Sequence, residues 1–189
     1  MMREEIERDI TEAWEREAYP GDERLAGGVS FHPSEYTYVA EFFRGKHWKD
    51  VTWQALRDGY QGPPDACLAF MSAEAFRFYL PAFMLIALRD FRAADMAGEA
   101  AMASLTPPSF HPELYELAKQ PGVTEEMNPC SQANVARQRE WWDGRIAGFT
   151  PQQRQVIAAF LDHMDRTHGA DYASDLSGPR AALEHWRSL

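Results

Sequence analysis

The chain has 189 residues, 45% of them hydrophobic, and a net charge of −10. This length fits about one domain, and the composition excludes a disordered chain. A field this acidic repels the phosphates of nucleic acid and attracts basic protein surfaces. We therefore expect a single helical domain over residues 1–189 that binds a protein partner, a basic one, and does not bind nucleic acid directly.

The cysteines and the apolar segments bear on the cellular compartment. Cys67 and Cys130 have neither the spacing of a metal knuckle nor that of a CxxC pair, and we expect two reduced thiols. The N-terminus, MMREEIERDI, is acidic and lacks the apolar stretch of a signal peptide. The longest apolar run, residues 78–88, is shorter than the ~20 residues that span a bilayer. These features predict a cytoplasmic protein that does not contact a membrane.

Residues 1–24 read as an acidic amphipathic segment. Apolar residues at helical spacing predict a helix over residues 3–18, which Pro20 and Gly21 end. Nine acids against four arginines give this segment half of the net charge. Its carboxylates either bind a basic partner or simply solvate the helix. The candidate partner contacts are Glu12, Glu15, Asp22 and Glu23.

Three short elements are expected before the middle of the chain. A helix over residues 34–43 begins at the cap Ser34 and ends before Gly45. A second helix, over residues 52–58, closes on Gly59 in a left-handed conformation. Residues 67–71 are apolar, and periodicity does not distinguish a short buried strand or hairpin from an extended lead-in.

The most apolar segment is residues 72–91. Ser72 is a suitable N-cap, and Arg77 is the only charge between Ala75 and Leu88. A helix that is apolar all round is buried all round. Pro81 removes a backbone donor and clashes with the carbonyl four residues earlier, which predicts a kink or two abutting helices. The expected fold class is mainly α, an irregular helical bundle around this Pro-kinked helix.

The C-terminal half is also predicted to be helical. We expect helices over residues 94–104, 112–119 and 132–146. Thr150, Pro151 and Gln153 then form the signature of a capping box, and Gly169 closes the helix that follows. A last short helix is expected within the tail, residues 170–189.

A basic and aromatic stretch, FFRGKHW at residues 42–48, stands out in the acidic chain. Either its rings are core and its basic residues solvate a turn, or the basic residues grip an anion beneath a stacked Trp48. The second interpretation gives a ligand pocket that also draws on the apolar segment. Its candidate residues are Arg44, His47, Trp48, Arg77 and Tyr79.

Arg77 is the residue on which the two interpretations differ. A buried arginine must be paired, so it either forms a structural ion pair with Glu74, Asp50 or Asp90 or holds a carboxylate or phosphate in a pocket.

Two further clusters can be interpreted either as structural residues or as chemical sites. The segment EWWD, residues 140–143, places two carboxylates beside a tryptophan pair, which serves either acid–base chemistry or helix packing. His163 and His168 are five residues apart, which does not suit a metal pair on one helix. We expect no catalytic residue, no metal and no cofactor.

Several blocks resemble an uncharacterised bacterial family, a domain of unknown function. They are FFRGKHW at residues 42–48, MSAEAFRFYLPA at 71–82 and SLTPP at 104–108. The resemblance covers residues 34–165 and implies a family but no activity. Two functions remain. The first is a non-catalytic interaction protein, in its sharper form an immunity protein that neutralises a toxin acting in the cytoplasm. The second is a small enzyme or ligand-binding protein with an anion pocket at His47, Arg77 and Tyr79.

Overall fold

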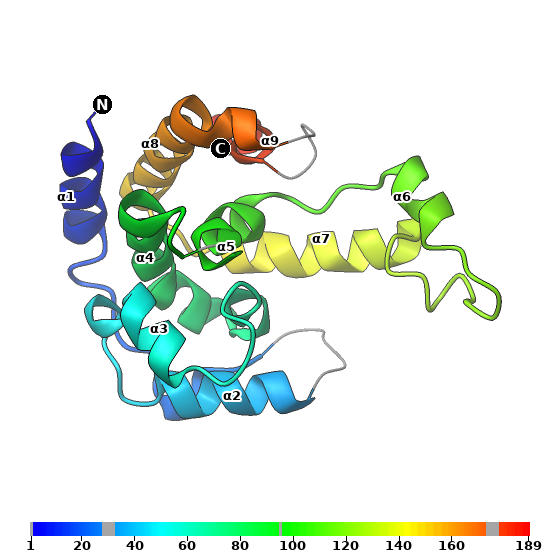
Figure 1. Cartoon of the computed structure of the whole chain (residues 1–189), viewed down its shortest axis with the longest axis horizontal. Coiled ribbons are helices and arrows are strands. Elements are labelled where there is room, and N and C mark those ends of the chain that lie inside the picture. The colour runs from blue at the N-terminus through cyan, green and yellow to red at the C-terminus, as the bar shows by residue number, and fades with distance from the viewer. Residues whose placement is uncertain (1, 28–32, 95, 173–177) are drawn as a thin grey trace.

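The computed structural model of the protein describes residues 2–27, 33–94, 96–172 and 178–189. Over these residues the regular structure is helical, and one isolated antiparallel bridge joins Ala26 to Met71 (Figure 1). The mainly α fold class is therefore confirmed. The α-helices are α1 Arg3–Ala13, α2 Pro33–Phe43, α3 Trp53–Gly59, α4 Ala73–Asp90, α5 Met96–Leu105, α6 Pro112–Leu117, α7 Gln132–Ile146, α8 Pro151–His168 and α9 Pro179–Trp186. Short 3-10 helices are η1 Asp22–Arg24, η2 Trp48–Asp50, η3 Cys67–Phe70 and η4 Gly169–Asp171.

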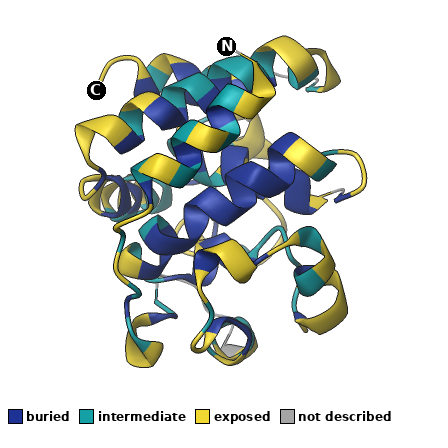
Figure 2. Ribbon diagram, turned by 90° about the vertical axis from the view of Figure 1, so that its left-hand side faces the viewer, coloured by how far each residue is buried: buried dark blue, intermediate teal, exposed yellow. Residues whose placement is uncertain are grey.

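Helix α4 is the centre of the core. The Ser72 hydroxyl accepts a hydrogen bond from the Ala75 amide at 3.0 Å, which confirms the expected cap. Thirteen of its eighteen residues are buried, and α1, α5, α7, η2 and η3 all contact it. Figure 2 shows buried residues concentrated in the middle of the molecule. One helix runs through Pro81, so of the two predicted alternatives, a kink or two abutting helices, the second is wrong.

Helix α1 ends earlier than its pattern predicts. It stops at Ala13, not Ala18, because the next residue turns inward. Trp14 caps the helix with a φ of −110°, and its buried indole N–H donates to the Arg77 carbonyl at 2.8 Å. Ile6 and Ile10 are fully buried beside it, so the predicted apolar face is confirmed for these residues, and α1 contacts α4 and α8.

Two local predictions before α4 are corrected. Gly59 is the last residue of α3 and does not have a positive φ, because the chain continues into an extended Tyr60. Residues 67–70 form the 3-10 helix η3, and Met71, the next residue, forms the isolated antiparallel bridge with Ala26. This single 3-10 helix buries Cys67, Leu68 and Phe70.

The C-terminal helices α8 and α9 pack on each other and beside α1 and α5. The capping box is confirmed, since the Gln153 amide donates to the Thr150 hydroxyl at 3.2 Å and the Thr150 amide donates to the Gln153 side chain at 3.0 Å. Helix α8 contacts α1 and α9. The tail holds η4 and α9, and its residues 173–177 lie outside the described part of the chain.

Residues 107–131 form an arm that stands away from the other helices. Figure 1 shows α6 and the chain around it beyond the body of the molecule, at the far end of α7. No residue of α6 is buried. The helix α7 has the predicted bounds and buries side chains only in its last turns, Trp142, Arg145 and Ile146.

Candidate functional site

The basic and aromatic stretch encloses a hydrophobic junction between α2, η2 and α4. Phe42, Phe43 and Trp48 are buried in the core. Gly45 has a φ of 64°, a left-handed conformation that glycine adopts at no steric cost, and it ends α2. The rings of this stretch are therefore core, while Arg44 is exposed on the turn.

Tyr79 is sealed beneath this junction. Its hydroxyl donates to the carbonyls of Phe43 and Lys46, which lie 2.9 and 2.8 Å away. The residue has no exposed surface, and this burial raises the pKa of the Tyr79 hydroxyl. A phenol that is buried, protonated and already bonded to two carbonyls holds the α2 terminus on α4 and is not open to a ligand.

His47 lies on the outer side of the same junction. The ring is exposed, its Nδ1 accepts from the Lys49 amide at 3.1 Å, and its edge meets Phe78 at a centroid distance of 5.4 Å. The hydrogen bond caps η2. His47 and Tyr79 thus lie at the same junction, one exposed and one enclosed, with no contact between their polar atoms among the described interactions.

Arg77 is half-buried and has no ion pair among the described residues. Its guanidinium lies against Gly148, in the turn between α7 and α8; a Cβ added to that glycine would lie 2.7 Å from the Arg77 Cζ. The predicted pairing with Glu74, Asp50 or Asp90 is not observed there. The Arg77 guanidinium therefore contacts Gly148, whereas the Tyr79 hydroxyl bonds to the end of α2 and the His47 ring caps η2.

A second arginine, Arg145, is buried, and the sequence analysis did not identify it. It is only 3% exposed, and its guanidinium carbon lies 3.6 Å from the Phe76 ring centroid and 4.2 Å from that of Trp141. One Nη donates to the Leu68 carbonyl at 2.8 Å, and Nε has no hydrogen-bond partner. Burial lowers the pKa of Arg145 to about 9, so the side chain is charged at pH 7.

The two aromatic faces explain how this cation is tolerated. Cation–π contact with two rings partly replaces the lost hydration, since such contacts strengthen when they are desolvated. The sequence carried a partial signal, because Arg145 follows Trp141 by one helical turn on α7. Phe76 could not be found in this way, because it comes from α4.

The EWWD segment is split by the helix that carries it. Trp142 is buried and its indole donates to the Ser104 carbonyl at 2.9 Å, while Trp141 covers Arg145. Glu140 and Asp143 are exposed, and Asp143 pairs with Arg139 at 3.0 Å. The tryptophans therefore pack the helix.

The four candidate partner contacts are all exposed but differ in what they bind. Glu12 lies 3.9 Å from Arg8, one helical turn earlier on α1. Asp22 accepts hydrogen bonds from the Tyr19 hydroxyl at 2.5 Å and from the Gly45 amide at 3.2 Å, so it holds the chain after α1 against the end of α2. Glu15 and Glu23 have no side-chain bond among the described residues.

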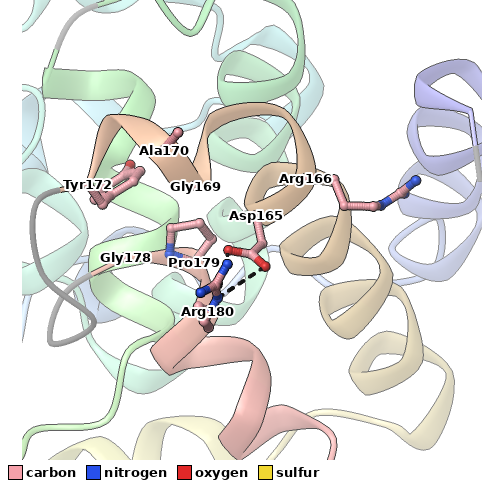
Figure 3. A pocket seen from close by; sticks show the side chains of 8 residues that line it. All are labelled: Asp165, Arg166, Gly169, Ala170, Tyr172, Gly178, Pro179 and Arg180. Atoms are coloured by element: carbon pink, nitrogen blue, oxygen red, sulfur yellow. Dashed lines mark hydrogen bonds and ion pairs between the residues drawn. The ribbon is translucent and has the colours of Figure 1, made fainter.

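Several cavities lie at the molecular surface. One of about 380 Å³ lies beside the start of α9 (Figure 3). In it Asp165 faces Arg180, with Nε–O distances of 3.4 and 3.5 Å, while Arg166 points away. Tyr172 and Gly178 on its rim flank residues outside the described part. The opposite charges at its centre neutralise one another, so the cavity presents no unbalanced group.

A second open cavity lies between α2 and α3. It measures about 440 Å³ and is lined by Tyr38, Glu41, Phe42, Lys46, Ala55, Asp58, Gly59 and Gln61. Lys46 belongs to the basic stretch, but its ammonium donates to the Phe42 carbonyl and lies 4.4 Å from the Phe42 ring centroid. Arg77, His47 and Tyr79 are not among the residues that line this cavity.

In the described part of the chain, no group of three or more His, Cys, Asp or Glu side chains is placed to hold a metal ion. Within the same ranges, no helix combines the length and the hydropathy needed to cross a bilayer. Both cysteines are free, Cys67 buried and Cys130 half-buried.

These features define the class of the protein as a helical, acidic chain with its aromatic residues in the core and its carboxylates outside. The model of a family of unknown function, DUF6714, matches residues 2–126, and the chain belongs to this family. The matched range contains the FFRGKHW and YLPA blocks, begins before the expected residue 34 and ends before α7. No curated protein and no solved structure matches the chain.

Proposed function

We propose that the protein is a non-catalytic interaction protein that binds a basic protein partner through its acidic surface. In its sharper form, the proposal is a bacterial immunity protein that binds and neutralises a toxin acting in the cytoplasm, for example a nuclease. A nuclease is basic because it binds phosphate backbones. The inhibitor of such an enzyme needs a complementary, acidic surface.

The observation that carries the proposal is the orientation of α1. Ile6, Ile10 and Trp14 are fully buried, which fixes one face of the helix against the core. Glu12 on α1, and Glu15 and Glu23 after its end, are exposed to solvent. Carboxylates held in this way attract a basic surface and raise the rate of association by roughly 10–1,000-fold at low salt.

The test is binding to the product of the neighbouring gene. The chain and that product are co-expressed, and their affinity is measured at 50 and 500 mM salt. We expect the triple variant Glu12→Gln, Glu15→Gln, Glu23→Gln to bind at least tenfold more weakly than wild type at low salt. The matched control is Glu41→Gln, Glu140→Gln, Glu184→Gln, three acids that are also exposed.

The control removes the same formal charge from other parts of the surface. A general effect of net charge would weaken both triple variants equally and would contradict the α1 site. If the product binds no more tightly at low salt than an unrelated protein of the same charge, the proposed function is wrong.

A further inference from the structure

The arm, residues 107–131, is a built element that displays apolar side chains. Its order comes from polar contacts. The Tyr115 hydroxyl donates to Glu125 at 2.6 Å. Asn128, which is 2% exposed, donates to the Tyr115 carbonyl at 3.3 Å and accepts from the Cys130 amide at 2.9 Å. These bonds close the arm on itself.

A side chain of α7 joins the arm to the rest of the molecule. Asn134 donates to the backbone carbonyls of Glu126 and Asn128, at 3.0 and 2.6 Å. Ser131 caps α7 next to this contact by accepting from the Asn134 amide at 3.3 Å. The arm is thus fixed at the start of α7 by hydrogen bonds, and its exposed apolar side chains take no part in these contacts.

Those apolar side chains face solvent. Leu114, Leu117 and Met127 are 44%, 77% and 66% exposed. Over the described residues they make up half of the six large hydrophobic side chains that are exposed. Leu114 and Leu117 are one helical turn apart and share a face of α6. Scattered exposed leucines need no explanation, whereas two that share one helix face on a projecting element, with an exposed methionine on the same element, mark an interaction site.

The charges around this cluster define its partner. Four exposed acids, Glu113, Glu116, Glu125 and Glu126, surround the leucines and the methionine in the sequence. The basic side chain among them, Lys119, is already paired with Glu116 at 2.6 Å. Exposed leucines with acids on either side of them along the chain are complementary to a basic amphipathic helix, whose leucines contact the leucines while its lysines meet the acids.

We propose that the arm is the docking surface for a basic amphipathic helix of a protein partner. This inference rests on the proposed function and adds a surface that α1 does not supply. The arm lies at the opposite end of the molecule from α1 (Figure 1). It gives an apolar contact that the acids at α1 do not give, and buried apolar anchors contribute most of the binding free energy of an interface.

The test uses a labelled 18-residue peptide of leucine and lysine with one apolar face, and a scrambled peptide of the same composition. Anisotropy titrations give the affinity at 50 mM salt. We expect the amphipathic peptide to bind wild type at least tenfold more tightly than the scrambled one. The triple variant Leu114→Ser, Leu117→Ser, Met127→Ser should lose tenfold or more. The control Met2→Ser, Met96→Ser removes two other exposed methionines and should stay within twofold.

Circular dichroism checks that the variants are folded. Two further double variants test the contribution of charge. Glu113→Gln, Glu126→Gln should weaken binding of the amphipathic peptide at least threefold, and the control Glu41→Gln, Glu184→Gln should not. Equal affinity of arm variants and wild type would overturn the inference, as would equal binding of both peptides. If the triple variant Glu12→Gln, Glu15→Gln, Glu23→Gln no longer binds the peptide while the arm variants still bind it, the docking surface on the arm is wrong and the proposed function stands. If the arm binds the peptide but the neighbouring gene product is not bound, the proposed function is wrong and the arm stands.

Discussion

The indole of Trp14 donates a hydrogen bond to the backbone carbonyl of Arg77 at 2.8 Å. This carbonyl is the one that Pro81, four residues later in α4, cannot serve, because proline has no N–H. The end of α1 therefore supplies the donor that the proline withholds. This contact explains both why α1 stops at Ala13 and how α4 runs through Pro81 as one helix.

Replacing Trp14 by Phe should reveal this compensation. The change leaves the Arg77 carbonyl without a donor and opens a small cavity, so we expect the free energy of unfolding to fall by about 2–4 kcal/mol. In a Pro81→Ala background, the new amide of residue 81 can serve the carbonyl, and the cost of Trp14→Phe should be about 1 kcal/mol smaller. Urea unfolding of the four proteins of this cycle measures the difference. Additive effects would contradict the compensation.

The sequence was sufficient where local chemistry decides the structure. The capping box at Thr150 and the exact bounds of α7 follow from residues a few positions apart. It was insufficient where the deciding contact is distant. Nothing near Ala13 announces that Trp14 will bond to α4, and the end of α3 at Gly59 is set by Tyr60 turning into the core.

In the candidate site, too, distant contacts could not be predicted from the sequence. The predicted ion pair of Arg77 is not present among the described residues, and a single apolar segment does not indicate which groups Arg77 and Tyr79 contact. The Tyr79 hydroxyl donates to backbone carbonyls of α2 and the turn after it, and the Arg77 guanidinium packs against Gly148. Arg145 was missed because its burial depends on Phe76, which is 69 positions earlier in the chain.

Arg77 gives a prediction about salt. Because Arg77 has no described ion pair, Arg77→Met should change the free energy of unfolding by less than about 1 kcal/mol, equally at 50 and 500 mM salt. The control is Arg89→Met on the same helix, since Arg89 donates to Glu7 at 2.7 and 2.9 Å. Its loss, about 0.2–1 kcal/mol, should shrink as salt rises. A loss of 3 kcal/mol for Arg77→Met would indicate a buried ion pair after all.

Arg145 gives a prediction about buried charge. Methionine keeps the length of the side chain and its contact with Phe76 and Trp141 while removing the desolvated cation. The Leu68 carbonyl keeps a donor, the Met71 amide at 3.4 Å. We therefore expect Arg145→Met to lose no more than about 1 kcal/mol of unfolding free energy, or to gain some. Arg145→Ala, which leaves a cavity, should lose about 2–4 kcal/mol. Equal losses in thermal or urea unfolding would show that the charge itself is needed.

Two helical glycines should respond to alanine with opposite signs. A Cβ on Gly144 in α7 meets no atom within 4 Å, so Gly144→Ala should stabilise the protein by about 0.5–1 kcal/mol through the better helix propensity. A Cβ on Gly98 in α5 would lie 2.7 Å from the Phe91 carbonyl oxygen, which is backbone and cannot move aside. Gly98→Ala should therefore lose about 1–3 kcal/mol. Melting temperatures of the two variants decide this, and a stabilised Gly98→Ala would refute the close approach of α5 to Phe91.

His185 gives a prediction about pH. Its ring lies 5.0 Å from the Trp142 ring centroid, and its Nε2 is buried without a hydrogen-bond partner. Burial, with a smaller effect from Arg139, lowers the pKa of His185, and Asp143 opposes the shift. The unfolded chain therefore binds more protons than the folded one as the pH falls through about 6.5, and stability must decrease there.

His185→Phe removes this titration and keeps a ring against Trp142. The free energy of unfolding, measured in urea between pH 7.5 and 5.5, should fall less steeply for this variant than for wild type. His111→Gln is the control, because the His111 side chain makes no capping bond at α6 and its removal leaves the buried imidazole in place. An unchanged slope in His185→Phe would mean that His185 takes up its proton as readily in the folded protein as in the unfolded chain, in which case its Nε2 reaches water.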